Sequence, residues 1–131
     1  MRCFVTCSVT VALGLAVGGC NLTGPSEPLT GTWTASLGNF SFVGLMLQQS
    51  GDEITGTACS RSDGVLLYHG VPVNGDYPRV AFTVPATHTQ PCCALLAGTR
   101  FSGRQDSTGD IVGRLDNVDV RFERSTTDVC R

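Results

Sequence analysis

The stretch "VDVRFER", residues 118–124, decides the fold class because its side chains alternate between apolar and charged. Val118, Val120 and Phe122 lie on one side of the pattern, and charged residues lie on the other until the last position. Such alternation is typical of a half-buried β-strand, because successive side chains of a strand point to opposite faces of its sheet. The sequence therefore predicts a strand here, with its apolar face turned toward a core.

Upstream of this strand, seven more segments have strand-like patterns with turn signals between them. The predicted strands cover residues 31–38, 40–49, 53–60, 65–73, 79–84, 94–104 and 110–116. Gly, Asn, Asp and Ser cluster between most of them, as turns require, and no segment has sustained helical periodicity. Eight short strands in meander order predict an all-β fold, an eight-stranded antiparallel up-and-down barrel in which closure removes exposed edges. A two-sheet sandwich is the alternative.

The N-terminal segment reads as a targeting signal. Arg2 is followed by an uncharged, mostly apolar run over residues 3–17, which is short for a membrane span of about 20 residues. Its end, Val17-Gly18-Gly19-Cys20, resembles the lipobox of bacterial lipoproteins. The resemblance implies cleavage before Cys20 and acyl chains on that residue, which would anchor the chain in a membrane.

This interpretation divides the chain into a signal peptide at 1–19, a lipidated tether at 20–29 and one barrel domain at 30–131. Asn21 stands where such proteins often carry an aspartate that retains them in the inner membrane. The resemblance therefore favours the outer membrane of a bacterial cell envelope, with the domain facing the periplasm or the cell surface.

The cysteine count of seven is odd, and the targeting signal explains why. Cys3 and Cys7 leave with the signal, and lipid consumes Cys20. Four cysteines remain: Cys59, Cys92, Cys93 and Cys130. An even number in an exported domain predicts two disulfides, each contributing about 3–4 kcal/mol. A bond between the adjacent Cys92 and Cys93 would close a strained eight-membered ring, so the sequence predicts that each bonds to one of the other two.

Short motifs resemble known small barrels. "LTGTWT" at 29–34 and "GDEITGTA" at 51–58 resemble avidins, and the Gly-x-Trp of the first strand resembles the wider calycin superfamily. The resemblance implies that Trp33 lies at the closed end of the barrel beneath the Arg124 guanidinium, a cation–π contact worth about 0.5–2 kcal/mol. Alternation independently gives Arg124 the inward phase of its strand. Trp33 is the only tryptophan, whereas avidins hold biotin with several, so the resemblance extends to the fold and not to the ligand.

The chain carries no recognisable catalytic motif. His69 and His88 have no motif partners, "DSTGD" at 106–110 fits a hairpin turn better than a calcium loop, and the four cysteines lack zinc-ligand spacing. We therefore expect no enzyme, no metal site and no cofactor. After cleavage the chain holds eight arginines and eleven acidic residues, a net charge of −3, which argues against a nucleic-acid partner.

Binding is the function that these observations favour. One hypothesis is a small apolar ligand inside the barrel; the alternative is a protein-interaction or hydrolase-inhibitor module that uses a disulfide-pinned loop at 85–93. The volume of the interior should separate them. If the large aromatic side chains fill the barrel, an internal ligand has no room. The candidates for that role are Trp33, Phe42, Phe82, Phe101 and Phe122.

Overall fold

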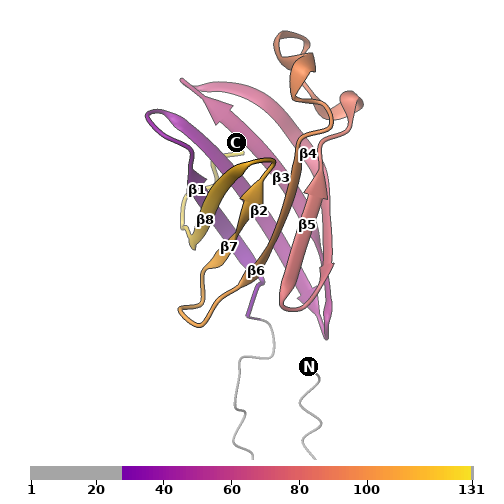
Figure 1. The fold of residues 1–131 in the computed structure, drawn as a ribbon, viewed down its shortest axis with the longest axis vertical. Helices are drawn as coiled ribbons and strands as arrows, with labels where there is room; N and C mark the ends of the chain where they lie inside the picture. The colour runs from indigo at the N-terminus through magenta and orange to yellow at the C-terminus, as the bar shows by residue number, and fades with distance from the viewer. Residues whose placement is uncertain (1–27, 131) are drawn as a thin grey trace, which may run out of the picture.

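A computed structural model describes residues 28–130 of the chain. The predicted signal peptide, Cys20 and most of the predicted tether lie outside the described residues. Eight strands pair in sequence order and close into an antiparallel barrel, which confirms the predicted fold class (Figure 1). The strands are β1 (Gly31–Ser36), β2 (Ser41–Ser50), β3 (Glu53–Ser62), β4 (Val65–Asp76), β5 (Arg79–Thr83), β6 (Arg100–Gln105), β7 (Ile111–Leu115) and β8 (Val118–Arg124).

Two seams of the barrel are short. β2 and β3 pair over their whole lengths, from Ser41–Ser62 to Ser50–Glu53. In contrast, β1 meets β8 only at the pairs Trp33–Arg124 and Thr34–Glu123. β4 meets β5 only at Val73–Phe82 and Asn74–Ala81. Pairing in the closed sheet is therefore most extensive within β1–β4 and within β5–β8.

The predicted sixth strand was wrong in its first half. β6 begins at Arg100, and residues 94–96 belong to a short 3-10 segment, η2 (Pro91–Leu96), which follows the single turn η1 (Ala86–His88). The physical reason is pairing: β5 has only five residues, and its partners on β6 run from Arg100 to Arg104. The apolar residues before Arg100 have no strand to pair with, so the loop between β5 and β6 is longer than predicted.

The core is a stack of side chains inside the barrel. Phe101 lies between Phe82 and Phe122, with ring centroids 5.4 Å and 5.2 Å away. All three rings are buried, as is Trp33. Phe42, which the sequence offered as a fifth interior aromatic residue, is partly exposed instead. It precedes the buried Val43 on β2, so alternation turns its side chain to the outside.

The lower end of the barrel in Figure 1 is closed by the segment that leads into β1. Leu29 is fully buried, and its carbonyl accepts a hydrogen bond of 3.0 Å from the Trp33 indole. The Arg124 guanidinium lies 4.5 Å from the centroid of the Trp33 ring, where alternation and the calycin resemblance predicted it. It also donates to the carbonyl oxygens of Thr30, at 2.9 Å, and Pro28. Arg124 therefore fastens the start of the domain across the closed end.

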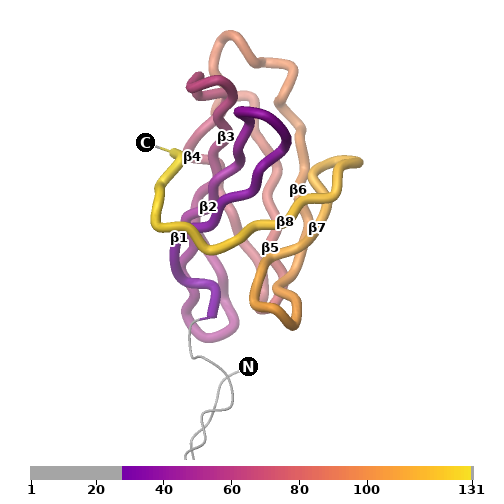
Figure 2. The backbone as a smooth tube through the Cα atoms, turned by 90° about the vertical axis from the view of Figure 1, so that its left-hand side faces the viewer, coloured from indigo at the N-terminus to yellow at the C-terminus, as the bar shows by residue number. Residues whose placement is uncertain are grey.

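The C-terminal tail crosses the outside of the barrel and is bonded to β3 (Figure 2). After β8 the tail passes β1, where Ser125 N–H donates to the Thr32 carbonyl at 2.9 Å. It ends in a disulfide between Cys130 and the fully buried Cys59. Gly44, paired with Cys59 in the sheet, makes room for the tail, since a Cβ there would lie 2.4 Å from a methyl group of Val129.

The predicted disulfide pairing was therefore wrong. Cys59 bonds to Cys130, and the adjacent Cys92 and Cys93 bond to each other. The reason is tertiary: the tail carries Cys130 to the face of β3 on which Cys59 points outward. The two neighbouring cysteines are then each other's partner, and the eight-membered ring that we expected to be avoided is formed. Between residues 28 and 130, no helix has the length and hydropathy of a membrane span.

Candidate functional site

Four loops meet at the end of the barrel opposite Leu29 and Trp33. They join β1 to β2, β3 to β4, β5 to β6 and β7 to β8, and all lie in the upper part of Figure 1. We call this the loop end. The polypeptide enters the barrel at the closed end, so the loop end is the part of the domain farthest from the predicted tether.

Large apolar side chains that are exposed to solvent gather at the loop end. Seven such residues occur among the described residues, and six of them lie in or next to these loops. The six are Leu37, Phe40, Phe42, Val65, Leu95 and Val118. Phe40 is 70% exposed and Leu95 is 99% exposed. The seventh, Met46, lies midway along β2. Exposed apolar side chains that share one end of a molecule point to an interaction site more than single scattered ones do.

Phe40 is held in an unfavourable backbone conformation. Its φ is +63°, in the left-handed region that bulky residues rarely adopt. Two hydrogen bonds fix the surrounding loop: Leu37 N–H donates to Ser41 at 2.9 Å, and Asp63 N–H of the next turn donates to the Phe40 carbonyl at 2.9 Å. The loop between β1 and β2 is therefore tied to the turn between β3 and β4. An exposed phenylalanine in such a position brings no evident gain to folding, and outliers of this kind concentrate at functional sites.

The loop between β5 and β6 is anchored at its base. The Val84 N–H donates to the Thr99 carbonyl at 2.9 Å, and the Gly98 N–H donates to the Val84 carbonyl at 2.8 Å. The Gln90 N–H donates to the carbonyl of Leu67 on β4 at 2.9 Å. Beyond these anchors, η2 carries the Cys92–Cys93 disulfide and the protruding Leu95. The predicted 85–93 loop thus continues to residue 99, and its most exposed apolar side chain lies outside the predicted range. The prediction that disulfides pin this loop to the barrel was wrong, because Cys92 and Cys93 bond to each other and backbone hydrogen bonds hold the loop instead.

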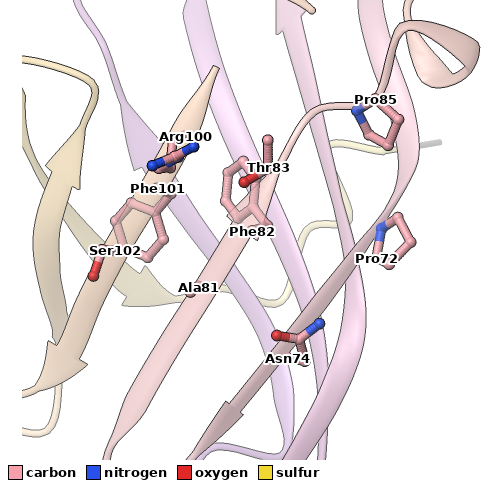
Figure 3. A pocket seen from close by; sticks show the side chains of 9 residues that line it. All are labelled: Pro72, Asn74, Ala81, Phe82, Thr83, Pro85, Arg100, Phe101 and Ser102. Atoms are coloured by element: carbon pink, nitrogen blue, oxygen red, sulfur yellow. The ribbon is translucent and has the colours of Figure 1, made fainter. Parts of the chain in front are cut away.

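A second feature is a groove in the wall where β4 and β5 pair only briefly (Figure 3). Its volume is about 510 Å3, and Pro72 and Pro85 flank one side of it. Phe82 and Phe101 also line it, but their rings are buried in the barrel beneath its floor, and the Arg100 guanidinium lies near them on the exposed side. An open groove with apolar walls and one cation suits an apolar ligand that carries a negative charge.

Tyr68 lies where the loop between β5 and β6 crosses β4. It forms an isolated bridge with Thr89 and is buried. Its hydroxyl is enclosed and has no hydrogen-bond partner of good geometry among residues 28–130, although the Ser60 hydroxyl is near enough to lower its pKa. Burial raises the pKa of Tyr68 from 10.0 to about 12, and the neighbouring Ser60 hydroxyl offsets part of that rise.

This burial predicts a loss of stability in alkali. Above pH 10 the unfolded tyrosine releases its proton, while the folded one keeps it up to about pH 12. Deprotonation therefore stabilises only the unfolded state, by about 1.4 kcal/mol for each pH unit between these limits. Urea unfolding at about pH 9 and pH 11 should show that loss, and Tyr68→Phe should reduce it. Equal pH dependence in the two proteins would contradict the prediction.

The histidines are placed apart from these features. His69 is exposed on β4, and His88 is half-buried in η1. No three His, Cys, Asp or Glu side chains within residues 28–130 lie close enough together to hold a metal ion. The "DSTGD" segment forms the turn between β6 and β7, where Asp106 and Asp110 accept hydrogen bonds from Arg121 at 3.2 Å and 2.9 Å. A bond from Thr108 and the charge of Arg121 lower the pKa of Asp106.

Sequence reasoning did not find the loop end. Each of its residues is a single apolar side chain near a turn, and only the closed barrel brings the four turns together. The aromatic residue at position 40 follows Gly38 and Asn39, which are typical turn residues. An aromatic side chain in a turn could have indicated an exposed binding residue. Compared with protein-family models, with curated proteins and with solved structures, the chain matches none.

Proposed function

We propose that this chain is a lipid-anchored protein of the bacterial envelope that binds a partner protein through its loop end. The observation that carries the binding proposal is that, within residues 28–130, six of the seven large exposed apolar side chains lie at that end. The lipid anchor rests on the lipobox-like Val17–Cys20 segment. A chain held by acyl groups on Cys20 would present its closed end to the membrane, because Leu29 lies there. The loop end would then face away from the lipid.

Preorganisation favours a protein partner. The loops that carry Phe40 and Val65 are tied by the hydrogen bond between Asp63 and Phe40, and the loop with Leu95 is fixed at its base. Loops that are already ordered lose less conformational entropy on binding. The protruding Leu95 beside the Cys92–Cys93 ring would suit a cleft in the partner, as the hydrolase-inhibitor hypothesis requires.

Photo-crosslinking in living cells tests this proposal on the full-length, exported chain. A photoreactive amino acid is placed at Phe40 and, as the control, at Met46, which is 41% exposed on the side of the barrel. We expect a discrete protein adduct from position 40 and none from position 46. Adducts that consist of lipid only, or equal adducts from both positions, would overturn the proposal. Intact-mass analysis of the membrane fraction, with Cys20→Ala as its control, tests the anchor separately.

Phe40→Asn then separates binding from folding. Asparagine tolerates the left-handed conformation, so we expect the free energy of unfolding to stay the same or rise. Affinity for the crosslinked partner should fall by at least about tenfold, as for an interface hot spot, while Met46→Asn should leave it unchanged. Loss of stability together with loss of binding would indicate that Phe40 has a structural role instead.

A second candidate is a small apolar ligand, supported by the groove between β4 and β5 rather than by the barrel interior. The buried rings of Phe82, Phe101 and Phe122 occupy that interior. In the groove, Arg100 would pair with a negative group of the ligand. Anilinonaphthalene sulfonate is a suitable probe: we expect Arg100→Gln to weaken its binding and Arg79→Gln, an exposed arginine outside the groove, to leave it unchanged. Equal effects of both changes would count against the groove.

A further inference from the structure

The two disulfides lie in different surroundings. Cys59 is fully buried beneath the C-terminal tail, and Arg61 of the same strand donates to the Val129 carbonyl of that tail at 3.0 Å. Cys92 is exposed and Cys93 is half-buried, on the part of the β5–β6 loop beyond its hydrogen-bonded anchors. A reagent in solution therefore reaches Cys92 without any movement of the barrel.

The two bonds also differ in what they hold together. The Cys59–Cys130 bond joins residues 71 positions apart, whereas the Cys92–Cys93 bond joins neighbours. A crosslink stabilises a fold mainly by restricting the unfolded chain, and the effect grows with the length of the closed loop. The bond between neighbours adds little to stability by this route, so opening it leaves the barrel folded.

The adjacent bond also coincides with a break in local structure. Within η2, Cys93 has φ −131° and ψ 28°, outside the helical range, and it separates two short 3-10 turns. Leu95 follows two residues later and is the most exposed large apolar side chain at the loop end. The conformation of Cys93 therefore sets the direction in which Leu95 projects.

From these observations we propose that Cys92–Cys93 is a site of reversible thiol–disulfide exchange with dithiol reductants, and that Cys59–Cys130 stays closed under the same conditions. A thiolate of the dithiol attacks Sγ of Cys92 and forms a mixed disulfide, and Sγ of Cys93 leaves as a thiolate. The second thiol of the reductant then attacks the reductant sulfur that is bonded to Cys92 Sγ, which closes the reductant's own disulfide and releases Cys92 as a thiolate. The reductant is oxidised by two electrons to its own disulfide, and both cysteines become thiols. Exposed disulfides are the ones that take part in such exchange.

Exchange at this site would change the loop end. Without the bond, Cys93 is free to adopt helical dihedral angles, and η2 can form one continuous turn that projects Leu95 in a new direction. This consequence for partner binding rests on the proposed function. The exchange itself does not, because it depends only on the exposure of Cys92 to a reductant in solution.

Alkylation under native conditions tests the proposal on the purified, exported chain. The protein is equilibrated with increasing ratios of reduced to oxidised dithiothreitol, quenched with N-ethylmaleimide, and mapped by peptide mass spectrometry. We expect Cys92 and Cys93 to be labelled at a ratio at least about tenfold lower than Cys59 and Cys130, and oxidised dithiothreitol to reverse the reduction. Near-ultraviolet circular dichroism should show that the barrel stays folded.

Two matched variants complete the test. Cys92→Ala/Cys93→Ala should take up no label in the low-ratio range, and Cys59→Ala/Cys130→Ala should keep the early labelling. Labelling of all four cysteines at one ratio, or of Cys92 and Cys93 only after unfolding, would overturn the proposal. If the labelling pattern is as expected but reduction does not alter the crosslink from position 40, the exchange site stands and its link to partner binding fails.

Discussion

Replacing Cys59 and Cys130 together with alanine should lower the free energy of unfolding by about 4 kcal/mol, the loop-entropy value for a crosslink between residues this far apart. The position of the bond makes that loss consequential. β1 and β8 close the barrel through only two residue pairs, and the tail held by Cys130 spans the outside of β1 and β2 next to that seam. Since small domains are stable by about 5–15 kcal/mol, the loss takes a large fraction of the total.

Urea unfolding at neutral pH measures this effect, and Cys92→Ala/Cys93→Ala is the matched control. The control variant should lose only about 1 kcal/mol of its free energy of unfolding, because a bond between neighbouring residues hardly restricts the conformations of the unfolded chain. Losses of equal size in the two variants would show that the tail does not stabilise the barrel through its crosslink.

Phe101→Ala should have an effect of similar size, a loss of about 4 kcal/mol, the range measured when a large buried aromatic residue is truncated. Phe101 is fully buried and contacts the rings of both Phe82 and Phe122. Its removal would therefore leave a cavity in the middle of the interior stack. If this variant does not fold, Phe101→Leu should fold with a smaller loss, and Phe40→Ala is the control that leaves the interior intact.

The same variant tests whether the barrel has room for an internal ligand. An apolar cavity of this kind stays dry and accepts benzene. We therefore expect benzene to raise the melting temperature of Phe101→Ala and not that of the wild type. An equal rise in both proteins would mean that the native interior already has free space, which would favour an internal apolar ligand over the loop-end proposal.

Much of the barrel could be predicted because its signals are local. The alternation of Val120 and Phe122 with charged neighbours reports one buried face wherever the strand lies in the fold. Turn residues such as Asp63 and Gly64 also act locally, through their tolerance of positive φ. The contact between Trp33 and Arg124 was implied by the calycin resemblance, and alternation supported it by giving both residues the inward phase.

The errors arose where a position depends on distant parts of the chain. Residues 94–99 are apolar enough for a strand, but β5 is too short to pair with them. Val118 has the inward phase of β8, yet it lies at the rim and is exposed, because the barrel ends there. The alternation of apolar and polar residues within one segment cannot show where the strand that pairs with it ends.

By itself, the amino-acid sequence determined the all-β class, the order of the eight strands and the inward phase of Trp33 and Arg124, because these follow from side-chain alternation and turn chemistry; that the two side chains meet was implied by the calycin resemblance. Only the tertiary structure decided which cysteines bond and which apolar residues gather at the loop end. Both depend on the closure of the barrel, which brings the tail to β3 and four separate turns to one end. Sequence spacing carries no information on either distance.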